Sequence, residues 1–60
     1  MNWNEIKRIA EEKGFKFIRH GKKHDIYYNY ETGTMIQIER HWSQEIRKGL
    51  MNRLKKEIGF

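Results

Sequence analysis

The stretch HDIYYNYETGTMIQIER, residues 24–40, decides the fold that the sequence predicts. Its two ends, residues 24–30 and 34–40, are rich in aromatic and β-branched residues, which is typical of strands. The short loop between them contains Gly33, and glycine suits the positive φ that a tight hairpin loop requires. The stretch therefore predicts an antiparallel β-hairpin.

Alternation along the hairpin predicts which side chains face the core. In the strand 34–40, Ile36 and Ile38 alternate with mixed positions, so one face is apolar and needs a cover. In the strand 24–30, we expect Ile26 and Tyr28 to face the core together with Tyr30. The opposite, solvated face would then hold Asp25, Tyr27 and Asn29, with Tyr27 as the aromatic residue most available to a ligand.

Helical periodicity flanks the hairpin on both sides. Residues 2–13 place apolar side chains three and four apart, at Trp3, Ile6, Ile9 and Ala10. Asn2 is a suitable N-cap for this helix, with Glu5 three residues on, and Gly14 is a stop signal. Residues 47–58 place apolar side chains four apart, at Leu50, Leu54 and Ile58, and are followed by Gly59.

Residues 15–20, FKFIRH, form an extended, aromatic run between the first helix and the hairpin and predict one more strand. The order is then α-β-β-β-α with no parallel crossover. The expected fold class is α+β, with two layers: a three-stranded antiparallel sheet and two helices on one of its faces. With 60 residues, the chain is expected to be one domain, residues 1–60.

Composition narrows the classes of function. Thirteen Lys and Arg against eight Asp and Glu give a net charge of +5 and favour a polyanionic partner, nucleic acid before a membrane surface. The absence of cysteine excludes disulfides and thiol catalysis and fits a reducing compartment. No apolar run is long enough for a membrane span or a signal peptide, so we expect a cytoplasmic protein without membrane partners.

Five cations follow one another with no acid between them, at Lys13, Lys16, Arg19, Lys22 and Lys23. Such a run attracts phosphate, and with the neighbouring tyrosines it resembles a platform for single-stranded nucleic acid. The alternative is a solvated charged surface without a specific ligand.

Three histidines, His20, His24 and His41, supply groups that titrate near neutral pH. Cleaving RNA without a metal requires a base, an acid and cations that stabilise the charge on phosphorus, and histidine and lysine supply all of these. His24 directly follows Lys22 and Lys23, whereas Asp25 should point to the other face. The spacing of the histidines matches no zinc signature, so no metal and no cofactor are expected.

Three segments, GFKFIRHGKKHDIYYN, IQIERH and EIRKGLMNRLKKEIGF, together resemble the HicA family of small mRNA interferase toxins. The matching landmarks are Gly14-Phe15, Lys23-His24, Arg40-His41, Gly49 and Gly59-Phe60. The resemblance implies a fold similar to a double-stranded RNA-binding domain, which agrees with the order of elements predicted from periodicity.

The resemblance also implies metal-independent cleavage of messenger RNA, with His24 in the catalytic position and a HicB-type antitoxin as partner. Lys22, Lys23 and Arg19 would bind phosphate, and Arg40 and His41 would assist on the substrate side. His20 is a further candidate proton carrier. The chain departs from the family pattern at Lys22, where glycine usually precedes the Lys-His or Ser-His pair, and at Glu39, where proline is common.

Two functions of other classes remain open. A noncatalytic RNA-binding module of the same fold would hold an A-form backbone with Lys22, Lys23, Lys55 and Lys56, and its binding would survive loss of His24. A protein-binding unit would use the basic surface to dock an acidic antitoxin or regulator, with little salt-dependent binding of RNA.

Overall fold

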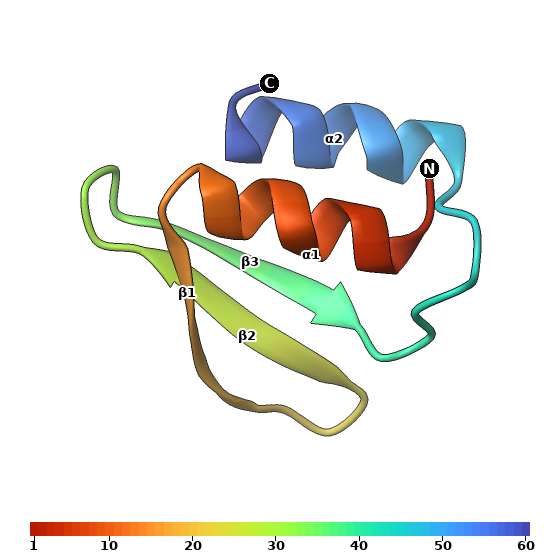
Figure 1. Ribbon diagram of the computed structural model, residues 1–60, viewed down its shortest axis with the longest axis horizontal. Coiled ribbons are helices and arrows are strands. Elements are labelled where there is room, and N and C mark those ends of the chain that lie inside the picture. The colour runs from red at the N-terminus through yellow and green to blue at the C-terminus, as the bar shows by residue number, and fades with distance from the viewer.

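The computed structural model describes residues 1–60 and confirms the predicted order of elements. Both helices lie over the same face of an antiparallel sheet, and the other face is open (Figure 1). Neither helix has the length and apolar character needed to cross a membrane. The elements are α1 (Trp3–Glu12), β1 (Phe15–His20), β2 (His24–Asn29), β3 (Thr34–Glu39) and α2 (Lys48–Ile58).

The helix ends follow local sequence signals. The side chain of Asn2 accepts a hydrogen bond from the backbone N–H of Glu5 at 2.9 Å, and Glu5 accepts one from the backbone N–H of Asn2 at 3.3 Å. This reciprocal pair is a capping box, and it confirms Asn2 as the N-cap of α1. At the other end of the chain, Gly59 ends α2 with φ of 92°, a left-handed conformation that glycine adopts without strain.

The sheet has the order β1-β2-β3, so β2 is central and both other strands are edges. Tyr27 pairs with Phe17 on one side and with Ile36 on the other. Between Phe17 and Arg19 the register of β1 shifts, which is an irregularity of the kind produced by a β-bulge. Gly33 has φ of 73° in the loop before β3, as the hairpin prediction requires.

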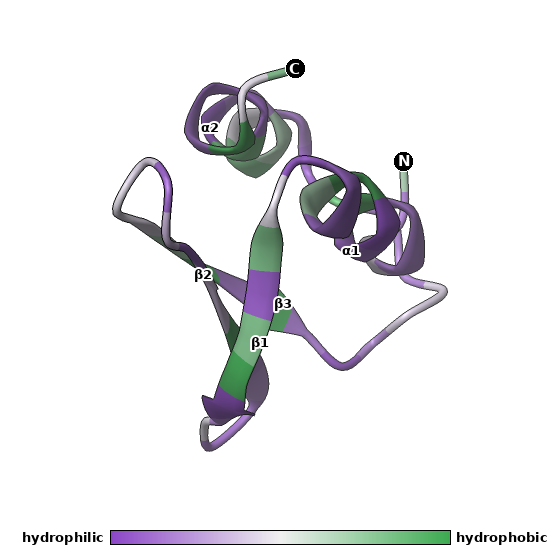
Figure 2. Cartoon of the chain, turned by 60° about the vertical axis from the view of Figure 1, so that its left-hand side comes forward, coloured by the Kyte–Doolittle hydropathy of each residue, from purple (hydrophilic) through white to green (hydrophobic).

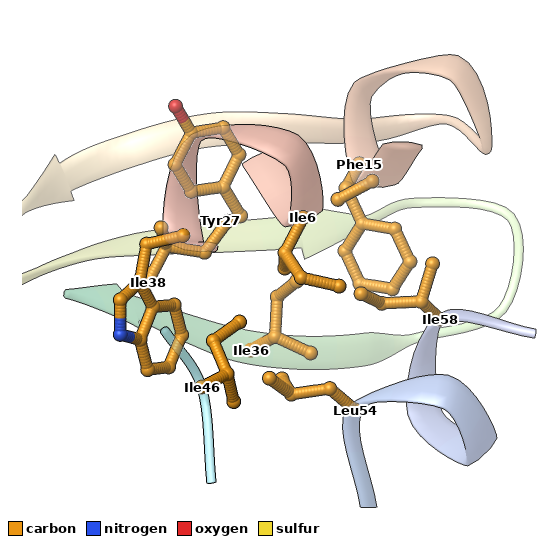
Figure 3. Packing of buried hydrophobic residues seen from close by; sticks show 10 residues of the cluster. Ile6, Phe15, Tyr27, Ile36, Ile38, Ile46, Leu54 and Ile58 are labelled. Atoms are coloured by element: carbon orange, nitrogen blue, oxygen red, sulfur yellow. The ribbon is translucent and has the colours of Figure 1, made fainter. Parts of the chain in front are cut away.

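Every element contributes to one apolar core between the sheet and the helices. Figure 3 shows the labelled side chains converging in this layer. The cluster consists of Trp3, Ile6, Ala10, Phe15, Tyr27, Ile36, Ile38, Ile46, Leu54 and Ile58. Leu50, the first member of the predicted stripe on α2, lies at the margin and is partly exposed.

The predicted orientation of the tyrosines in β2 is wrong. Tyr27 is only 2% exposed and its ring lies among the core residues (Figure 3). Tyr28, in contrast, is half-buried on the open face, and Tyr30 is 68% exposed. Burial raises the pKa of the Tyr27 hydroxyl, with the charges of Glu11 and Asp25 adding to the effect.

The error has a physical cause in the position of β2. β2 lies between β1 and β3 and carries buried residues on both of its faces, because Ile26 is 5% exposed on the open face although it lies outside the core cluster. Asp25 and Asn29, which made the core face look hydrophilic, are buried with hydrogen-bond partners. Asn29 donates to the carbonyl of Lys13 at 3.1 Å and accepts from the backbone N–H of Glu31 at 2.9 Å.

Candidate functional site

The turn between β1 and β2 carries His24 at one end of the sheet. Figure 2 shows the end of β1 and this turn in the hydrophilic colour. The backbone N–H of Gly21 donates to the carbonyl of His24 at 2.7 Å and closes the turn. A Cβ atom at Gly21 would lie 3.0 Å from that carbonyl oxygen and 3.3 Å from Cδ2 of the His24 ring. The imidazole therefore packs directly over Gly21, and no side chain fits beneath it without displacing it.

Arg40 holds the same turn from the end of β3. Its Nη2 donates to the carbonyl of Gly21 at 2.6 Å and to that of His24 at 3.3 Å. Its Nε donates to Oδ1 of Asp25 at 2.9 Å. These bonds fix the guanidinium plane, while Nη1 has no hydrogen bond within the chain and stays available to a substrate oxygen.

Asp25 is the buried anchor of this arrangement, with 6% of its surface exposed. Its Oδ1 also lies 2.7 Å from Nδ1 of His20. Burial opposes ionisation of the carboxyl group, but the hydrogen bonds from His20 and Arg40 outweigh it, and the pKa of Asp25 lies below its ordinary value. The result is a polar network of His20, Asp25 and Arg40 that closes one end of the sheet.

The three histidines lie in different surroundings. His24 is half-buried, and its only hydrogen bonds involve the backbone, so neither ring nitrogen has a partner within the chain. His20 is engaged by Asp25 and its ring lies 4.9 Å from that of Phe17, on the core side of the sheet. His41 is exposed beyond β3, and its side chain makes no hydrogen bond.

The predicted phosphate-binding cations are exposed, and none of them forms an ion pair. Lys22 and Lys23 lie in the turn immediately before His24. Arg19 pairs with Ile26 in the sheet and belongs to the open face, as does Lys16, which pairs with Tyr28. The turn lysines, His24 and Arg40 are thus together at one end of the sheet, with Arg19 on the adjoining open face.

A groove of about 290 Å³ runs between β3 and α2 and reaches His24. His24 pairs with Glu39 across the β2-β3 ladder, and both line the groove. Its other polar lining residues are Gln37, Arg53 and Glu57. Neither the groove nor any other part of the chain has a group of three or more His, Cys, Asp or Glu side chains that could hold a metal ion.

The sequence did not predict the Asp25 network or the groove. Arg40 reaches Asp25 and Gly21 across 15 and 19 positions of sequence, which no local pattern encodes. One signal was present, because Asp25 is the only acidic residue between Lys13 and Tyr30 in a strongly cationic stretch. An isolated acid in such a stretch indicates a paired, structural carboxylate.

The protein is thus a small two-layer α-β-β-β-α domain in which a half-buried histidine begins β2 directly after a lysine-rich turn. The chain belongs to the HicA toxin family: the family model, described as the HicA toxin of bacterial toxin-antitoxin, matches residues 3–60. Membership makes the chain the toxin of a toxin-antitoxin pair, with an antitoxin as its partner. Neither the comparison with curated proteins nor the comparison with solved structures gives a match.

Proposed function

We propose that this toxin is a metal-independent endoribonuclease that cleaves messenger RNA with His24 as its catalytic residue. The observation that carries the proposal is the surroundings of His24, whose ring lies beside Gly21 while neither ring nitrogen has a hydrogen-bond partner in the chain. A general acid or base needs a ring nitrogen that is free to reach the proton it transfers. The family assignment supports the toxin role.

In the proposed reaction the 2′-hydroxyl of RNA attacks the adjacent phosphorus, and the bond to the 5′-oxygen breaks. His24 takes the proton of the 2′-hydroxyl or delivers one to the leaving 5′-oxygen. Lys22 and Lys23 stabilise the negative charge that develops on the phosphoryl oxygens. The products are a 2′,3′-cyclic phosphate and a free 5′-hydroxyl.

The remaining predicted site residues are assigned to substrate binding. Arg19 would bind a neighbouring phosphate from the open face, and Arg40 would use its free Nη1. His41, exposed beyond β3, would contact the RNA backbone. His20 is left out of the reaction, because its pairing with Asp25 places it on the opposite face from His24.

The antitoxin is proposed to be of the HicB type, and an acidic surface on it would complement the net charge of +5. The cytoplasm is the proposed compartment, since messenger RNA is the proposed substrate.

The test is cleavage of a long single-stranded RNA in the presence of EDTA by the wild-type chain and by His24→Ala. Circular dichroism first establishes that both are folded. We expect cleavage by the wild type and a loss of at least about a hundredfold in the variant, the scale of general acid-base catalysis. Equal RNA binding with no cleavage by either would replace this proposal with a noncatalytic RNA-binding module.

A further inference from the structure

The groove between β3 and α2 is the hollow that adjoins the proposed catalytic histidine, and it has an apolar floor. Trp3, Ile36 and Leu54 line it and are each 3% exposed. Met35 and Leu50, also among its lining residues, are 56% and 37% exposed and form apolar margins. Its volume of about 290 Å³ lies just below the ~300–1,000 Å³ of ordinary small-molecule sites. One flat ring system fits such a space.

Charge in the groove differs in sign from the charge of the protein. The chain carries +5, yet the groove is lined by the carboxylates of Glu39 and Glu57 against the single guanidinium of Arg53. Phosphate is repelled from such a place and attracted to the lysines of the turn before His24. A hydrogen-bond donor without negative charge is the complementary ligand.

Glu39 is the carboxylate of the groove that has no ion pair. Oε1 of Glu57 lies 3.5 Å from Nε of Arg53, so this carboxylate already has a partner. Glu39 forms no ion pair, and its position in the ladder is directly opposite His24. A group bound by Glu39 is therefore placed beside the proposed reacting phosphate.

We propose that this groove holds one unpaired nucleobase of the RNA substrate, a base that carries an exocyclic amino group which donates to Glu39. The inference rests on the proposed function and makes it more specific. It divides the substrate between two surfaces: phosphate lies on Lys22 and Lys23, and the base lies on the apolar floor. A base can enter only when it is unstacked, so the substrate is single-stranded at the cleavage site.

Cytidine and uridine 3′-monophosphates test the proposal, because they match in size and charge while only cytosine carries an amino group. Two-dimensional NMR of the whole chain follows the Trp3 indole and the methyl groups of Met35 and Leu50 during each titration. The indole of Trp42, which is outside the groove, serves as the internal reference. We expect the groove signals to shift and the cytidine nucleotide to bind about tenfold more tightly, as one charge-assisted hydrogen bond gives.

Glu39→Gln should bring the affinity ratio of the two nucleotides close to one, since a neutral amide no longer favours the donor. Glu31→Gln, an exposed carboxylate in the hairpin loop, is the matched control and should leave the ratio unchanged. Equal affinity of the wild type for both nucleotides, or shifts confined to residues outside the groove, would overturn the proposal. The readout needs no cleavage, so a chain that discriminates between the nucleotides but cuts no RNA would contradict only the proposed function.

Discussion

The guanidinium of Arg40 is joined to the carbonyl of Gly21 by a 2.6 Å hydrogen bond, across 19 positions of sequence. This bond ties the end of β3 to the turn that carries His24. The same side chain reaches Asp25 at 2.9 Å, so a single arginine connects a buried carboxylate to the proposed catalytic turn.

Arg40→Gln should lower the free energy of unfolding by about 1–3 kcal/mol, because Asp25 loses a charged partner while remaining buried. Urea denaturation at neutral pH measures the change. Arg8→Gln removes an exposed arginine of α1 that has no ion pair and should shift the midpoint by less than about 0.5 kcal/mol. Equal effects of the two substitutions would mean that the Arg40 bonds add nothing to stability.

Gly21→Ala should leave the chain folded but displace the His24 ring, since the new Cβ atom would meet the His24 carbonyl at 3.0 Å. Misplacement of a catalytic group on this scale costs on the order of tenfold to a hundredfold in rate. Cleavage of RNA and the NMR signals of the His24 ring measure the two effects. Gly49→Ala is the control, because nothing lies within 4 Å of a Cβ atom there. If Gly21→Ala changes neither the rate of cleavage nor the NMR signals of the His24 ring, the turn tolerates a side chain at this position.

The stability of the chain should fall in acid through Asp25. The pKa of Asp25 in the folded chain is lower than its ordinary value of 3.8, so its contribution is present above about pH 4 and is lost as the pH falls through the lower, folded value. Urea denaturation between pH 7 and pH 2.5 measures this loss. In Asp25→Asn the decline below pH 4 should be shallower than in the wild type, and parallel curves would assign the acid sensitivity to other carboxylates.

Substitution of two neighbouring tyrosines by alanine should lower the free energy of unfolding by very different amounts. Tyr27→Ala removes a ring from the core and should cost about 3–5 kcal/mol, enough to abolish cooperative unfolding in a domain of this size. Tyr28→Ala acts on the open face and should cost much less. Thermal unfolding followed by circular dichroism compares the two variants. A larger loss of stability in Tyr28→Ala than in Tyr27→Ala would mean that Tyr28, and not Tyr27, packs in the core.

The parts of the fold that the sequence predicted correctly are those encoded locally. The capping box of Asn2 and Glu5 involves four consecutive residues, and the loop at Gly33 depends on one backbone angle. The face of β2 was not predictable in this way, because this central strand has buried residues on both faces and its polar residues are buried where they are paired.

In the candidate site, too, the sequence predicted the local features and missed those that depend on tertiary structure. His24 and its lysines are contiguous, so the sequence placed them together. The partners that fix them, Arg40 and Asp25, depend on the register of β2 against β3, which aligns His24 with Glu39. Register is a tertiary property, and the groove beside His24 exists only once α2 packs along β3.

The shifted register of β1 affects how the loss of toxicity of a variant should be interpreted. β1 is an edge strand with Phe17 and Ile18 exposed, and its irregular backbone and the charges of Lys16 and Arg19 oppose pairing with a strand of another molecule. Neutralising these cations would remove the proposed phosphate contact of Arg19 and also leave an exposed apolar edge strand without the charges that oppose its pairing. A variant of this kind that is not toxic in a growth assay has then either lost RNA binding or aggregated. The amount of soluble protein therefore has to be measured alongside toxicity.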